Sequence, residues 1–147
     1  FYFPCFIIVM DLCFFLGNFI KALGNIMGTF RDLRVWQEAV NLAVDIYSIT
    51  RTGDFSKDFG LKDQCQRSAV SISSNIAEGE ELDTDKQAIR HIFIAKGSCG
   101  ELLTQLLIAY RINYISHELY LKYETRCTRI SVMLKRLIHS KRNSTQI

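Results

Sequence analysis

Apolar residues recur every three or four positions through most of this chain, which is the spacing of an α-helix that buries one face. The first such segment follows Asp32 and ends in the loop that contains Gly53. Its apolar positions form two adjacent seams, namely Leu33, Trp36, Val40, Ala43 and Tyr47, and Val35, Ala39, Leu42, Ile46 and Ile49. An apolar arc this wide exceeds what one neighbouring helix covers. We therefore expect a helix that contacts two or more neighbours, with another subunit as one candidate.

The same pattern predicts three further helices. The second spans about residues 59–78, with Gly79 as its stop, and the third extends from near Thr84 towards Asn113. The third helix has two apolar seams, and the second of them holds Ile89, Phe93, Leu103, Leu107 and Tyr110. The fourth helix starts after Ser116, and all the connections are short, so consecutive helices should pack antiparallel. The sequence predicts an all-α fold, an up-down-up-down antiparallel four-helix bundle.

Small residues are concentrated in two of these helices. The second contains the stretch RSAVSISSNIAEG over residues 67–79, and the third contains Gly97 and Gly100. Each glycine in a helix interior costs about 1 kcal/mol relative to alanine, which a close backbone approach can offset. We expect the two helices to cross closely here, and a ligand pocket is the alternative. At the edge of the crossing we expect a polar network of Arg67, Asn75, Glu78 and Glu101.

The first 26 residues are far more apolar than the remainder, and the mean hydropathy of the whole chain is only +0.08. They lack the basic start and the small-residue cleavage site of a signal peptide. Asp11 interrupts the apolar run and would cost about 3 kcal/mol at the centre of a bilayer. We interpret residues 1–26 as an apolar leader that is not native, followed by one bundle domain over residues 27–147. A membrane anchor is the alternative.

The cysteines indicate packing and a reducing compartment. The chain has five, none in a CxxC pair, and Cys65, Cys99 and Cys127 fall at apolar positions of the helical patterns. Buried cysteine behaves as a small hydrophobic residue, and disulfide scaffolds are typical of short secreted chains. We therefore expect a cytoplasmic protein.

Charge is unevenly distributed although the net charge is only +3. The fourth helix carries seven basic residues and one acidic residue between Leu119 and Arg142. Its candidate nucleic-acid-binding flank comprises Lys122, Arg126, Arg129 and Arg136. This flank is either a surface that contacts only solvent or a row of cations that binds the phosphates of a nucleic acid. An acidic patch at the start of the third helix comprises Glu78, Glu80, Glu81, Asp83 and Asp85.

Motifs for chemistry are absent from the sequence. There is no Glu-x-x-His pair for a di-iron centre, no glycine-rich phosphate loop and no HExxH. Cys99 and His91 are eight residues apart on one helix, or about 12 Å, which is too far for a nucleophile and its base. We expect no enzyme activity, no cofactor and no metal site.

Three stretches carry a resemblance to a known family: FRDLRVWQEAVNLAVDIY, FGLKDQCQRSAVSISSNIAEG and FIAKGSCGELLTQLLIA. They resemble the four-helix-bundle proteins encoded in intervening sequences of bacterial ribosomal RNA genes. The accessory variability protein of diversity-generating retroelements is similar. The resemblance implies a homopentamer, and the retroelement member implies nucleic-acid binding and a reverse transcriptase partner. Members often carry a basic residue after AEG, whereas this chain has Glu80 and Glu81, which weakens that transfer at this position.

Taken together, the residues and the resemblance lead to one hypothesis with two alternatives. We expect a non-enzymatic, homo-oligomeric interaction module that binds RNA or a nucleic-acid enzyme through the basic flank of its fourth helix. The first alternative is a structural or protein-binding oligomer with no nucleic-acid contact. An enzyme is the second alternative.

Overall fold

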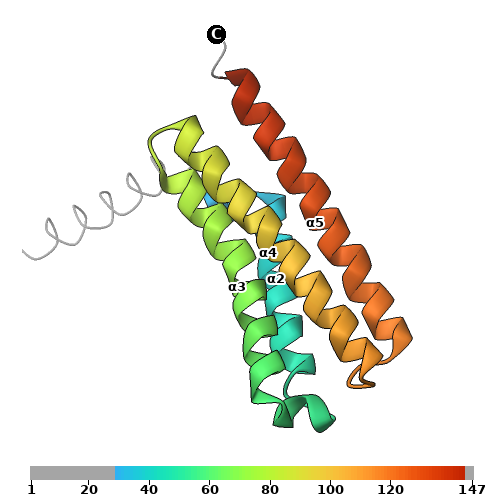
Figure 1. Cartoon of the computed structure of the whole chain (residues 1–147). Coiled ribbons are helices and arrows are strands. Elements are labelled where there is room, and N and C mark those ends of the chain that lie inside the picture. Colours follow the sequence, from blue (N-terminus) through green and yellow to red (C-terminus); the bar gives the residue numbers. More distant parts are fainter. Residues whose placement is uncertain (1–28, 145–147) are drawn as a thin grey trace, which may run out of the picture.

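The computed structural model describes residues 29–144, and these form a bundle of four long helices (Figure 1). The helices are α2 (Arg34–Ile49), α3 (Phe59–Glu81), α4 (Asp85–Arg111) and α5 (His117–Ser144), and two short 3-10 turns are η1 (Phe30–Asp32) and η2 (Gly53–Lys57). Each helix contacts the next one along the chain, and α2 also contacts α5, which closes the bundle. The predicted four-helix architecture is confirmed. The interpretation of residues 1–26 falls outside the described residues.

Short polar side chains fix where three of the helices begin. Asp58, Thr84 and Ser116 each precede a helix, and each accepts a hydrogen bond from the backbone N–H three residues later, at 3.0, 3.4 and 3.2 Å. Such caps satisfy backbone donors that have no partner within the helix. They place the starts of α3, α4 and α5 close to the positions that the apolar periodicity predicts.

Gly79 corrects one expectation, because it does not end α3. The helix continues to Glu81, and Gly79 is buried against α4. A Cβ atom on Gly79 would lie 3.1 Å from the carbonyl oxygen of Ala88 and 3.3 Å from the Cβ of His91. Gly79 therefore lets the backbones of α3 and α4 approach closely near the turn that joins them.

Gly97 and Gly100 correct a second expectation. Both are exposed, and a Cβ atom on either would have no other heavy atom within 4 Å. They therefore do not create the close crossing of α3 and α4 within one chain. The hydroxyls of Ser68, Ser71 and Ser98 make hydrogen bonds across that crossing instead, which agrees with the expectation that small residues permit it.

The core is built from the inward seams of all four helices and is apolar almost throughout. The predicted packing role of three cysteines is confirmed: Cys65, Cys99 and Cys127 are 0%, 3% and 1% exposed. Burial away from water disfavours the thiolate, and it raises the pKa of each of the three thiols to about 12. These thiols are therefore protonated and unreactive at neutral pH.

One helix of the described part, α4, is long and apolar enough to cross a membrane by length and composition alone. The bundle accounts for this composition, because α4 supplies core residues along its whole length, including Ile92, Leu102 and Leu106. Core helices of globular bundles meet the same criterion.

Candidate functional site

The basic flank of α5 is divided by the structure into paired and unpaired cations. The apolar seam of α5 packs into the core, and the flank faces α2. Arg126 contacts the carboxylate of Asp45, and Arg129 Nη2 lies 3.0 Å from Glu38 Oε1. Both carboxylates belong to α2. Two of the four predicted nucleic-acid-binding residues therefore form ion pairs that join α2 to α5.

The other two members of the predicted flank remain available to a partner. Among residues 29–144, Lys122 and Arg136 make no ion pair, and both are exposed. The ammonium of Lys122 lies 5.6 Å from the centre of the Tyr123 ring, which favours one orientation of the side chain but leaves the charge in solvent. The flank thus contributes fewer free charges than its sequence indicates.

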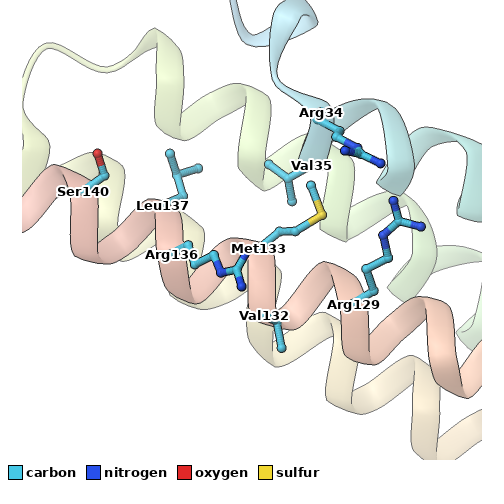
Figure 2. A pocket seen from close by; sticks show the side chains of 8 residues that line it. All are labelled: Arg34, Val35, Arg129, Val132, Met133, Arg136, Leu137 and Ser140. Carbon is cyan, nitrogen blue, oxygen red and sulfur yellow. The ribbon is translucent and has the colours of Figure 1, made fainter.

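A first groove lies between α2 and the second half of α5 and measures about 670 Å³ (Figure 2). Arg34 projects from α2, Arg129 and Arg136 project from α5, and Val35 and Met133 are among the apolar residues that line it. The negative charge of Glu38 is close to this groove, because Glu38 also lies 4.0 Å from Arg34 Nε. Part of the positive charge here is consequently already compensated.

A second groove, of about 510 Å³, lies between α4 and α5. Its charged lining comprises Lys96 from α4 and Lys135, Arg136 and Arg142 from α5, joined by the titratable His139. Phe93, Val132 and Ile138 make up its apolar lining. The apolar spacing of α4 predicts that Phe93 packs against a neighbouring helix, but the residue is 47% exposed. Lys96 and Phe93 were missed as site residues because they lie on a different helix from the predicted flank.

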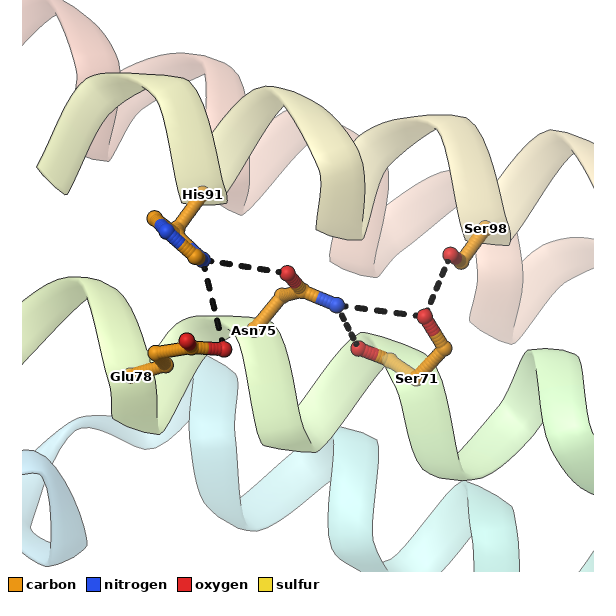
Figure 3. Close-up of polar contacts among 5 residues, drawn as sticks. All are labelled: Ser71, Asn75, Glu78, His91 and Ser98. Atoms are coloured by element: carbon orange, nitrogen blue, oxygen red, sulfur yellow. Dashed lines mark hydrogen bonds and ion pairs between the residues drawn. The ribbon is translucent and has the colours of Figure 1, made fainter. Parts of the chain in front are cut away.

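A polar network joins α3 to α4 and contains two of the four residues predicted for it (Figure 3). The hydroxyls of Ser71 and Ser98 are hydrogen-bonded at 2.8 Å. Asn75 Nδ2 donates to the backbone oxygen of Ser71 at 2.9 Å and to its hydroxyl at 3.1 Å. His91 Nδ1 lies 3.2 Å from Asn75 Oδ1 and 3.4 Å from Glu78 Oε2. The network therefore runs across the helix contact without a break.

The two other predicted members of the network are placed elsewhere. Glu101 accepts a hydrogen bond from the Ser68 hydroxyl at 3.4 Å, further along the same contact. Arg67 lies 3.8 Å from Asp63 on its own helix and does not reach α4 in the described contacts. The arrangement holds two helices together with short side chains and contains no nucleophile beside a base, so it supports a structural role.

The acidic patch is partly neutralised by the end of α5. Lys141 Nζ lies 3.0 Å from Glu80 Oε1, and the two side chains are only 19% and 21% exposed. Glu80 therefore has a positively charged partner within the bundle. In the part of the chain that the structure describes, no group of three or more His, Cys, Asp or Glu side chains is placed to hold a metal ion.

Comparison with known proteins identifies the bundle. The family model for the 23S rRNA-intervening sequence protein matches residues 31–136. The chain belongs to this family. A solved structure from Bacteroides thetaiotaomicron, described as a protein with unknown function from the S23 ribosomal protein family, is similar with a TM-score of 0.65 and 28% sequence identity. The similarity covers 71% of this chain and 97% of that chain. Comparison with curated proteins gives no match.

The residues matched by the family model include part of the lining of each groove. The stretch shared with the 23S rRNA-intervening sequence protein model includes Arg34, Phe93, Lys96, Lys135 and Arg136. His139 and Arg142, at the end of α5, lie beyond the matched residues. The wall that α4 contributes to the α4–α5 groove thus lies within the matched residues.

Proposed function

We propose that this protein is a non-enzymatic, oligomeric module that binds RNA or a nucleic-acid enzyme through the basic surface of α5. We define that surface by Lys122, Lys135, Arg136 and Arg142. The observation that carries the proposal is the excess of cations on α5 that have no carboxylate partner among residues 29–144. Unpaired surface cations bind phosphates by releasing the counterions that surround a nucleic acid.

Exposed apolar residues on two faces support the oligomeric part of the proposal. Val44 on α2 is 59% exposed, and Ile94 and Ile108 on α4 are 44% and 45% exposed. Apolar side chains gathered on a surface are typical of protein contacts. The sequence resemblance implies five copies. A ring would repeat the basic surface of each subunit, and linked sites bind one long RNA far more strongly than a single site does.

The resemblance also suggests the kind of partner. The retroelement accessory protein that these sequence blocks resemble works with a reverse transcriptase and binds nucleic acid. We infer that this chain acts in the cytoplasm in a similar pairing, with an RNA or with an enzyme that carries one. The proposal assigns no catalytic step to the chain itself.

The test is RNA binding by fluorescence anisotropy, with a structured RNA hairpin and salt varied from about 50 to about 200 mM. The triple variant Lys122→Glu, Lys135→Glu, Arg136→Glu should lose at least about tenfold in affinity and bind with a shallower salt dependence. Arg126 and Arg129 are unsuited to charge reversal, because a glutamate there would face the carboxylates of α2.

A matched control reverses the same number of charges elsewhere. Arg51, Lys86 and Arg90 are exposed, lie outside α5 and form no ion pair among the described residues, so the triple glutamate variant at these positions should keep most of the affinity. If the α5 variant binds RNA as well as the original protein, the basic surface is only a solvated face. The structural or protein-binding oligomer, which the exposed apolar residues of α2 and α4 favour, would then be the better account.

A further inference from the structure

Like the α2–α5 groove, the groove between α4 and α5 has an apolar lining, but its positive charge is less compensated. Four cations line it, Lys96, Lys135, Arg136 and Arg142, and none of the described residues that line it is acidic. A partner that fills this groove must therefore carry negative charge. Glu38 compensates the neighbouring α2–α5 groove, whereas nothing comparable lines this one.

The apolar part of the groove is an aromatic ring with a cation beside it. Phe93 is 47% exposed and Val132 is 46% exposed, so both present apolar surface that remains in contact with water. The guanidinium of Arg142 lies over the Phe93 ring, 5.7 Å from its centre. A planar group placed in this groove could stack on the phenyl ring and on the guanidinium plane.

We propose that this groove binds an unpaired nucleotide of single-stranded RNA or DNA. The base lies on Phe93 and Val132, and Lys96, Lys135 and Arg142 contact the flanking phosphates. A cationic groove with an aromatic platform is the arrangement that single-stranded nucleic acids require. A duplex would leave the apolar surface uncovered, because its bases are already stacked inside the helix. This inference rests on the proposed function and adds to it a preference for unpaired strands.

The test compares two ligands of equal charge. One is a fluorescent single strand of about ten nucleotides, within the site size of comparable grooves. The other is an abasic strand of the same length, which keeps the phosphates and lacks the bases. We expect the normal strand to bind about tenfold more tightly than the abasic strand, and Phe93→Ala to remove that difference. The salt dependence should not change in the Phe93→Ala variant, because no phosphate contact is lost.

Ile112, at the C-terminal end of α4, supplies the matched control. It is exposed to a similar extent, 44%, but it does not line the groove, so Ile112→Ala should bind both strands as the original protein does. Helicity by circular dichroism and oligomer size by sedimentation should be the same for both alanine variants. A change of oligomer size in Phe93→Ala alone would overturn the inference and assign the groove to a subunit contact.

Other outcomes separate this inference from the proposed function. If normal and abasic strands bind equally well, the nucleotide site is wrong while phosphate binding by the basic surface survives. If no nucleic acid binds at any salt concentration, both the site and the proposed function fail. If a peptide of alternating glutamate and phenylalanine displaces the single strand and binds more tightly, the groove is a site for an acidic protein segment, and the inference is overturned.

Discussion

The two neighbours of α4 in the chain contact it in opposite ways. Towards α3, the contact is made by short residues, with Gly79 against Ala88 and a hydrogen bond between Ser71 and Ser98. Towards α5, longer side chains meet, and a groove of about 510 Å³ is left beside them. Small residues bring backbones together and leave no space for a ligand, whereas long charged side chains separate the helices and leave room for a partner. Rigidity and binding capacity thus lie on opposite sides of one helix.

The largest expected effect comes from a substitution at the close contact between α3 and α4. Gly79→Leu places a side chain where even a Cβ atom would be 3.1 Å from a backbone oxygen. We expect it to lower the free energy of unfolding by about 3 kcal/mol, since overpacking forces helices apart. Chemical denaturation followed by circular dichroism measures this. A variant as stable as the original would show that α3 and α4 are not held at this separation.

High pH should lower the free energy of unfolding through the three buried thiols of α3, α4 and α5. The pKa of each thiol is about 12 in the folded protein against 9.0 in the reference state, so the unfolded chain releases these protons first. Stability is therefore complete below pH 9 and falls as the pH rises from 9 towards 12, by roughly 1.4 kcal/mol per pH unit for each thiol. Urea unfolding at several pH values measures the slope. Cys65→Ala should reduce that slope, and an unchanged slope would contradict the assignment to the thiols.

Single polar side chains on the two sides should differ in importance. Asn75→Ala removes the side chain that links Ser71 to His91 across the α3–α4 contact, and we expect a loss of about 1–2 kcal/mol because the hydrogen bonds that Asn75 makes to both residues are lost. Arg142→Ala removes a guanidinium that lies over the Phe93 ring across the α4–α5 contact, and such cation–π contacts at exposed sites contribute about 0.5–1 kcal/mol. Thermal unfolding of both variants compares them. An equal or larger loss in Arg142→Ala would remove the contrast between the two sides.

The smallest expected effect is a gain in stability on the solvent-exposed face of α4. Gly97 lies in a helix with nothing near a prospective Cβ atom, so Gly97→Ala should stabilise the protein by roughly 0.5–1 kcal/mol. Gly97→Leu should also be tolerated in the single subunit. If alanine destabilises the assembled protein but not a diluted, dissociated sample, Gly97 lies in a contact between subunits. Urea unfolding at two protein concentrations distinguishes these results.

The sequence predicts the helices and their order, because each helix has to bury an apolar face and this requirement repeats along the chain. The same periodicity does not determine which glycine faces a neighbour. Gly79 and Gly97 both occur in small-residue stretches, but the rotation of α4 against α3 places only Gly79 at the contact. That rotation depends on side chains from both helices at once, and no local pattern in either helix encodes it.

The candidate site shows the same limit. The cations of α5 are evident from the sequence, but Asp45 is 81 positions away from the arginine that it pairs with. Phe93 follows the apolar period of α4 and nevertheless remains half exposed, because α5 covers only part of that face. Predicting either result requires the relative placement of separate helices.

The closing contact between α2 and α5 has a consequence for the order in which the protein folds. The more extensive contacts between the long helices, α2–α3, α3–α4 and α4–α5, join consecutive helices, and such local contacts form quickly. The α2–α5 contact closes a much longer loop, so its entropic cost is greater and it should form last. As the chain is synthesised, α2, α3 and α4 can pack before α5 exists, and one apolar seam of α2 stays uncovered until then. A nascent chain halted after α4 would therefore expose that seam to other proteins.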